Sequence, residues 1–355
     1  MIASETGRVS IIICLFNVAR FLESKRLSCI LNQTWSNLEI ILVNDGSSDQ
    51  TWSICQDLAS VDTRIVLVNK TNGGLGSARN AGLDAAKGEF IWFYDVDDDA
   101  ELDLVEKNIG WMREYVADMT VFGCWFIDPD TGHAESSRFN DKLYQTNEAL
   151  KAGFVRDLFL VPNGNGFVWN KFYRRDFIET HGFRFPEERI QQDELFNMTL
   201  YPHVNRLFLS SEPLYRYYIY KSGNNRSRYI PDRILIYETV FNSLQNLRRE
   251  WGLQTEELEA FAYHRFYQGI ESSVLFNTFH PDAPSSKKWK RQEVSMILSR
   301  PLVRQCMKYV NEHNQFNLER RLFLGAFLSG DFFRMDAMRI VGKTLRKIKT
   351  FLRVK

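Results

Sequence analysis

The chain has 355 residues, which is enough for one large domain or for one domain with an appendage. Its apolar content of 44% is ordinary for a globular protein, and its formal net charge of +1 provides no overall field that would favour nucleic acid as a partner. The polar start at residues 1–6 does not fit a signal peptide, and no apolar segment approaches the ~20 residues of a membrane-spanning helix.

The first hundred residues alternate short apolar runs with helical patterns. We expect strands over 9–16, 38–43, 64–68 and 90–94, and helices over 20–33, 51–59 and 77–86. The strand runs are continuous and rich in β-branched residues, which is typical of strands buried on both faces. Such alternation predicts βαβ units and therefore a parallel sheet with right-handed crossovers.

Polar residues follow three of these strands directly. They are Asn17, the turn-rich cluster 44–49 and the acidic run 95–99. In parallel sheets, ligands bind at the carboxyl ends of the strands. We therefore expect these three segments to converge on one ligand-binding edge.

The acidic run Asp95-Val96-Asp97-Asp98-Asp99 places four carboxylates within five residues. Their mutual repulsion would be relieved by a cation, and oxygen ligands suit Mg²⁺ or Mn²⁺. Taken alone, such a run is more often a solvated turn. Its position after a strongly apolar strand favours a metal that bridges phosphates and stabilises a leaving diphosphate.

Three further residues have two readings each. Asp45 either closes an Asx turn or accepts a hydrogen bond from the N3–H of a uracil ring. Arg79 follows a glycine-rich loop at 72–76 that lacks the dinucleotide and P-loop patterns, and it fits a phosphate or a carboxylate partner equally well. Asp193 falls at the start of a helix, where an acid ordinarily offsets the helix dipole. The residues alone favour this plain reading of Asp193.

The pattern changes along the remainder of the chain. A strand near 119–127, a loop over 128–140, a helix over 145–160 and a turn over 163–166 come first, and then strands disappear from about residue 231. Helical periodicity marks 234–251, 256–276, 288–298 and 301–310. We therefore predict one α/β domain over 1–230 and a helical region over 231–355.

The last stretch, 334–355, contains eight Lys or Arg residues and the single acid Asp336. Apolar residues recur within it at near-helical spacing. A basic amphipathic helix of this kind lies on an anionic membrane, or it packs on its own domain and presents a solvated basic face.

Several segments together resemble the family-2 glycosyltransferases, which have the GT-A fold, a Rossmann-like, mainly parallel mixed sheet with flanking helices. The resemblance covers roughly residues 8–227, in the blocks 9–17, 33–49, 72–82, 88–98, 168–175, 183–187 and 213–217. Blocks in the right order are far more specific than any one motif. Cys14, Asn44 and Gln192 depart from the family's usual proline, aspartate and glutamate.

The resemblance implies an inverting, metal-dependent enzyme that transfers a sugar from a nucleotide-sugar to an acceptor hydroxyl of a glycan or glycoconjugate. A UDP-sugar is the favoured donor, and the setting would be surface polysaccharide or glycoprotein glycan synthesis. A GDP- or dTDP-sugar donor, or a catalytically inactive nucleotide-sugar binding module, are the alternatives. Free UDP, GDP or dTDP released in a donor screen would distinguish them.

The resemblance also assigns residues to roles. Asp193 would be the catalytic base, and Asp97 with Asp95 would hold Mn²⁺ or Mg²⁺. The nucleotide-sugar would be bound by Phe16, Asn17, Asp45, Arg79, Asp95, Val96, Lys221 and Arg226. The acceptor side would include Trp169, Asn170 and Lys171.

The five cysteines are scattered and lack CxxC spacing, so we expect reduced, mostly buried thiols and a cytoplasmic protein. Because many relatives use lipid-linked acceptors, we also expect a peripheral association with the inner face of the cell membrane through 334–355.

Overall fold

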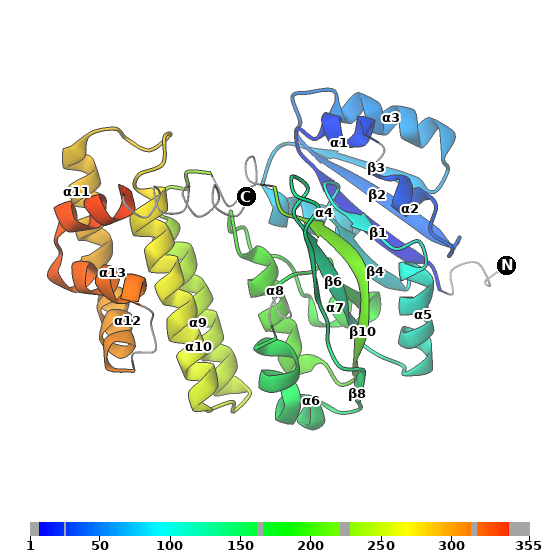
Figure 1. Cartoon of the computed structure of the whole chain (residues 1–355). Helices are drawn as coiled ribbons and strands as arrows, with labels where there is room; N and C mark the ends of the chain where they lie inside the picture. The colour runs from blue at the N-terminus through cyan, green and yellow to red at the C-terminus, as the bar shows by residue number, and fades with distance from the viewer. Residues whose placement is uncertain (1–6, 25, 162–165, 221–227, 314–317, 341–355) are drawn as a thin grey trace. The chain divides into compact units, whose positions relative to one another are not determined.

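The structure is a computed structural model that describes residues 7–24, 26–161, 166–220, 228–313 and 318–340. The chain divides into two compact units, Met1–Ser222 and Gly223–Lys355, whereas the sequence suggested a boundary at 230. Each unit has its own architecture, an α/β unit followed by a helical one (Figure 1).

The first unit is built on a ten-stranded mixed sheet with the order β3-β2-β1-β4-β9-β6-β10-β5, in which β7 pairs with β6 and β8 with β10. Its strands are β1 (Val9–Leu15), β2 (Leu38–Asp45), β3 (Ile65–Lys70), β4 (Phe90–Tyr94), β5 (Asp99–Ala100), β6 (Met119–Ile127), β7 (Ala134–Ser137), β8 (Lys142–Tyr144), β9 (Lys171–Arg174) and β10 (Leu207–Tyr218). The four predicted strands β1 to β4 pair in parallel. β9 runs antiparallel to both β4 and β6, so β6 points in the same direction as β4. This is the mainly parallel mixed sheet that was expected.

Helices cover both faces of this sheet. They are α1 (Ala19–Glu23), α2 (Ser28–Leu31), α3 (Thr51–Val61), α4 (Leu75–Ala85), α5 (Leu104–Glu114), α6 (Asn147–Phe154), α7 (Arg175–His181) and α8 (Gln192–Leu200). Ile11 and Ile13 of β1 share a core with residues of α1, α2, α3 and α5. On the opposite face α4 lies so close to β1 that a Cβ on Gly82 would be 2.4 Å from Cγ2 of Ile12. β1 is therefore apolar at successive positions because both of its faces are buried.

The structure differs from the expected elements at a few places. The helix predicted over 20–33 is two short helices, α1 and α2. The Ser24 hydroxyl donates to the Phe21 carbonyl at 2.9 Å, and such local side-chain bonds compete with helix continuation. The short strand β7 lies inside the predicted loop 128–140. β8, β9 and α7 were not predicted, because elements of three to seven residues leave little periodicity to detect. The longer helices α5 and α13 were not predicted either.

The second unit is helical over its described residues, with no strand among them, as expected. It contains α9 (Arg233–Glu250), α10 (Glu256–Glu271), α11 (Lys287–Ser299), α12 (Pro301–Glu312) and α13 (Leu318–Ser329). No helix in the described part of the chain is long and apolar enough to cross a membrane. Of the basic stretch 334–355, residues 341–355 lie outside the described residues. Within the part that is described, Met335 is buried and the Arg339 guanidinium lies 4.2 Å from the ring centre of Phe279.

Candidate active site

The loops that follow β1 and β2 are tied to each other at the carboxyl edge of the sheet. Asn17 has a φ of +54°, and its Oδ1 accepts a hydrogen bond from the Ser48 backbone N–H at 2.8 Å. Its own backbone N–H donates to Oγ of Ser47 at 3.0 Å. Phe16, beside it, is 39% exposed.

Asp45 ends β2 and organises the glycine-rich loop before α4. Its Oδ1 accepts from the Gly73 N–H at 2.9 Å and from Lys70 Nζ at 2.7 Å, while Oδ2 accepts from the Gly74 N–H at 2.9 Å. A carboxylate has about four lone-pair sites. Three are used here, so Asp45 retains capacity to accept one further donor such as an imide N–H.

The acidic run after β4 contains one residue with a structural role that the sequence did not reveal. Asp98 is 1% exposed, and its carboxylate accepts from the Tyr215 hydroxyl and the Tyr218 N–H, each at 2.9 Å. Its own N–H closes a turn onto the Asp95 carbonyl at 3.1 Å. Asp98 therefore anchors the turn to β10. In the sequence it looks like one more candidate metal ligand, because burial of a single acid within an acidic run leaves no signal.

Anchored in this way, Asp95 and Asp97 both keep partly exposed side chains, while Val96 between them is buried. Burial raises the pKa of Asp97. Desolvation, reinforced by the charges of Asp97 and Asp193 and opposed by Arg79, raises the pKa of Asp95 to about 6. The two carboxylates therefore occupy an environment that a positive charge would stabilise.

Arg79 joins the acidic run to Asp193. It lies on α4 and is 2% exposed. Its Nη1 donates to Oδ1 of Asp193, which stands in the first turn of α8, and its Nη2 lies 3.5 Å from Oδ1 of Asp95. Burial lowers the pKa of Arg79, but the carboxylates of Asp193 and Asp95 outweigh that effect and raise it. Arg79 therefore has carboxylate partners on two sides, and its contact with a phosphate stays a prediction.

The neighbour of Arg79 on α4 fixes the chain that leads to α8. Nδ2 of Asn80 donates to the Phe185 carbonyl at 2.9 Å, and Oδ1 of Asn80 accepts the Phe185 N–H at 2.8 Å. The Phe185 ring stacks on Phe196 of α8 with their centres 3.9 Å apart. This packing holds Asp193 beside Arg79. Sequence reasoning missed Asn80, although it lies within a block of the family resemblance.

The three residues expected on the acceptor side are buried and make internal contacts. Trp169 stacks on Tyr215 with ring centres 4.3 Å apart. Lys171 Nζ donates to Oδ1 of Asn170 at 2.9 Å and to the Phe167 carbonyl at 2.5 Å. Burial lowers the pKa of Lys171 to about 7, although the charge of Asp193 opposes that shift. Their contact with an acceptor stays a prediction, and Lys221 and Arg226 lie outside the described residues.

The described residues offer a metal part of a coordination shell. No group of three or more His, Cys, Asp or Glu side chains within the described residues is arranged to enclose an ion. Mg²⁺, however, is commonly held by one or two carboxylates together with substrate phosphates and water. Asp95 and Asp97 fit that mode of binding.

The chain has extensive similarity to known proteins. The model of the family described as "Glycosyl transferase family 2" matches residues 10–208. EpsH of Bacillus subtilis (strain 168), which bears a glycosyltransferase name, is 32% identical over 69% of this chain and 73% of its own length. The uncharacterized glycosyltransferase EpsJ of the same organism is 29% identical over 88% of this chain and 89% of its own length.

Solved structures share the architecture. Residues 1–349 of S. aureus TarS, in a complex with UDP, superpose with a TM-score of 0.59 at 19% identity, covering 96% of this chain and 91% of that one. The mannosyltransferase PcManGT from Pyrobaculum calidifontis, in complex with GDP-Man and Mn²⁺, gives a TM-score of 0.53 at 15% identity, covering 95% and 86%. These likenesses show the GT-A fold.

Proposed function

The chain belongs to glycosyltransferase family 2, and from that premise we propose that it transfers a sugar, with inversion, from a UDP-sugar to a hydroxyl of a glycan or glycoconjugate. The observation that supports this proposal best is the contact of Arg79 with both Asp193 and Asp95. It brings together, at the carboxyl edge of the sheet, the carboxylates assigned to the leaving group and to the incoming hydroxyl.

The donor would bind along the carboxyl ends of β1, β2 and β4. In this proposal Phe16 and Asn17 contact the nucleobase, and Asp45 uses its remaining acceptor capacity for the N3–H of uracil. The bound UDP and UDP-GlcNAc in the TarS structures support a UDP-sugar, and the GDP-Man in PcManGT keeps a GDP-sugar as the alternative.

The diphosphate would lie against Asp95 and Asp97. A divalent cation held there would neutralise the charge that develops on the leaving diphosphate. Asp98 contributes indirectly, because its hydrogen bonds to Tyr215 and Tyr218 hold the turn in which Asp95 and Asp97 stand.

Asp193 would act as the base. Arg79 engages Oδ1 of Asp193, which leaves Oδ2 for the acceptor hydroxyl. As the acceptor oxygen forms its bond to the anomeric carbon, Asp193 takes its proton, and the bond to the diphosphate breaks on the opposite face with its electron pair leaving on phosphate. A single displacement of this kind inverts the configuration, so an α-linked donor gives a β-linked product.

A donor screen tests the proposal. Purified protein is incubated with UDP-, GDP- and dTDP-sugars in Mn²⁺ or Mg²⁺, and the release of free nucleotide is measured with and without glycan acceptors. Release of UDP above that from the Asp193→Asn variant supports the proposal. If no donor released its nucleotide, the proposal would fail and the chain would be a catalytically inactive nucleotide-sugar binding module.

The acceptor and its location remain part of the proposal. We expect a glycan or lipid-linked acceptor, and an association of 334–355 with anionic membranes. Sedimentation with anionic liposomes, comparing the full chain with a chain truncated after residue 333, tests the association. Equal binding by both chains would remove it.

A further inference from the structure

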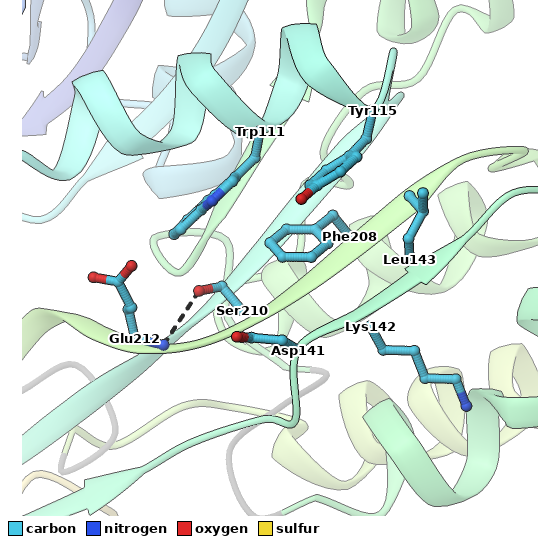
Figure 2. Close-up of a pocket in the computed structure, with 8 residues that line it drawn as sticks. All are labelled: Trp111, Tyr115, Asp141, Lys142, Leu143, Phe208, Ser210 and Glu212. Atoms are coloured by element: carbon cyan, nitrogen blue, oxygen red, sulfur yellow. Dashed lines mark hydrogen bonds between the residues drawn. The ribbon is translucent and has the colours of Figure 1, made fainter.

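A pocket lies in the first unit, away from Arg79, Asp95 and Asp193. Its volume is about 270 Å³. It is lined by Trp111, Tyr115, Asp141, Lys142, Leu143, Phe208, Ser210 and Glu212, and Figure 2 shows them around it. We call it the α5–β10 pocket.

The pocket lies toward the sheet edge opposite the candidate active site. Trp111 and Tyr115 come from the carboxyl-terminal end of α5. Phe208, on β10, pairs with Thr120 at the start of β6. Because β6 and β10 point in the same direction as β4, their amino-terminal ends lie at the edge away from Asp95. The α5–β10 pocket is therefore separate from the nucleotide edge.

Three aromatic side chains form one wall of the pocket. The Phe208 ring centre lies 5.4 Å from that of Trp111 and 4.7 Å from that of Tyr115. Phe208 is 7% exposed, whereas Trp111 and Tyr115 are only half-buried. The Trp111 indole N–H makes no hydrogen bond to any of the described residues. The wall therefore offers accessible aromatic surface and a free donor.

A break in strand pairing supplies polar groups on the other side. Pairing of β10 with β6 is irregular between Leu209 and Pro213, so Ser210 to Glu212 leave the regular ladder. The Ser211 N–H donates instead to Oδ1 of Asp141 at 2.6 Å, and the Glu212 N–H donates to Oγ of Ser210 at 3.2 Å. Such bulges commonly redirect side chains at functional sites.

The hydroxyl proton of buried Ser210 has no acceptor among the described residues. Ser210 is 1% exposed, and its Oγ accepts from Glu212 but donates to no other described residue. A buried hydroxyl proton ordinarily finds an acceptor. Together with the carboxylates of Asp141 and Glu212, it forms a set of donors and acceptors facing an aromatic wall (Figure 2).

We propose that the α5–β10 pocket binds a short segment of an uncharged glycan. The C–H groups on the face of a sugar ring carry partial positive charge, which suits the negative face of an aromatic ring. The hydroxyls around the edge of the sugar suit hydrogen bonds with carboxylates and a serine hydroxyl. Its volume, below the ~300–1,000 Å³ typical of small-molecule sites, suits sugar rings better than a whole nucleotide-sugar. Within the proposed function, on which this role rests, the pocket is a second contact for the glycan acceptor.

Saturation-transfer NMR with the full-length protein tests the site, using cellotetraose, chitotetraose and maltotetraose as probes and saturating UDP with diamagnetic Mg²⁺ to occupy the nucleotide edge. We expect saturation to pass from the protein to at least one tetrasaccharide. Trp111→Ala should weaken its binding about tenfold or more. Glu212→Gln should also weaken it, and it alters only the partly exposed ion pair with Lys107. Trp289→Ala, on α11 of the other unit, is the matched control.

The proposal would be overturned if none of the three probes received saturation from the protein. Equal binding by wild type and both pocket variants would also overturn it. Circular dichroism establishes that each variant is folded. A second readout separates this failure from failure of the proposed function. Trp111→Ala should lower kcat/KM about tenfold for a polymeric acceptor while leaving UDP-sugar hydrolysis unchanged. If wild type releases no nucleotide, the proposed function fails, and the NMR result still decides the pocket.

Discussion

Arg79 and Asp193 are 114 residues apart in the chain and joined by a direct ion pair, in which Nη1 of Arg79 donates to Oδ1 of Asp193. The same guanidinium lies 3.5 Å from Asp95. One buried cation is therefore shared by the carboxylates that we assign to opposite ends of the displacement. Arg79 sets the separation of those carboxylates through the rigid fork of its donors.

Arg79→Lys should test this positioning role. Lysine keeps the positive charge but loses the planar fork that serves two carboxylates together. We expect kcat to fall about 10²-fold, the size of effect that a small misplacement of catalytic groups produces. KM for the donor should change far less. Steady-state kinetics decide this, and a rise in KM with unchanged kcat would instead make Arg79 a nucleotide ligand.

Asp193→Asn should remove the base while nearly preserving shape. We expect kcat to fall by ~10²–10⁴-fold, the usual contribution of a general base. Donor affinity, measured by calorimetry with UDP and Mn²⁺, should be retained. Asp176→Asn, at an 83% exposed side chain on α7, is the matched control. Near-normal transfer by Asp193→Asn would reject the assignment.

The sequence predicted the parallel strands and the edge at which the acids gather, because continuous apolar runs followed by polar residues are strong local signals. It did not predict which acid would be buried. Asp98 is anchored by Tyr215 and Tyr218, whose contribution depends on the path of β10. Four-residue β9 was also missed, although it pairs antiparallel with both β4 and β6 in the middle of the sheet. Contacts between distant segments are set by tertiary packing, which no local pattern encodes.

Asn80→Ala should act at a distance from the chemistry. It removes both hydrogen bonds to the Phe185 backbone, which belongs to a residue that is 3% exposed. Each unsatisfied buried group costs about 1–3 kcal/mol, so the free energy of unfolding should fall by at least that amount. Because Phe185 leads into α8, kcat should fall as well. Urea denaturation and kinetics check both effects, and unchanged stability would contradict the tethering role.

Asp97→Asn should uncouple UDP binding from the metal. Among the described residues the site offers two carboxylates, so loss of one of them should weaken metal binding. We expect the affinity for UDP to lose its dependence on Mn²⁺ in calorimetric titrations. Asp99→Asn is a stringent control in the same acidic run, because Asp99 faces Arg216 at 3.9 Å instead. Equal loss in both variants would mean that only the overall charge of the run matters.

Lys171 should give the unfolding free energy a distinctive pH dependence. Burial lowers its pKa to about 7 in the folded chain, whereas an unfolded chain has the ordinary lysine value of ~10.4. Between these values the unfolded state binds more protons, so Lys171 makes stability rise with pH by up to about 1.4 kcal/mol per unit. Below pH 7 both states are protonated, and this contribution is level.

The buried cysteine thiols act in the opposite sense, because burial raises their pKa values. Comparison with Lys171→Met isolates the lysine from that shared background. From pH 7.5 to 9.0, the wild-type unfolding free energy should gain about 2 kcal/mol relative to the variant. Lys151→Met, at a partly exposed residue of α6, should behave as wild type does. Parallel pH profiles for wild type and Lys171→Met in urea denaturation would show that Lys171 is charged in the folded protein, held by Asp193 despite its burial.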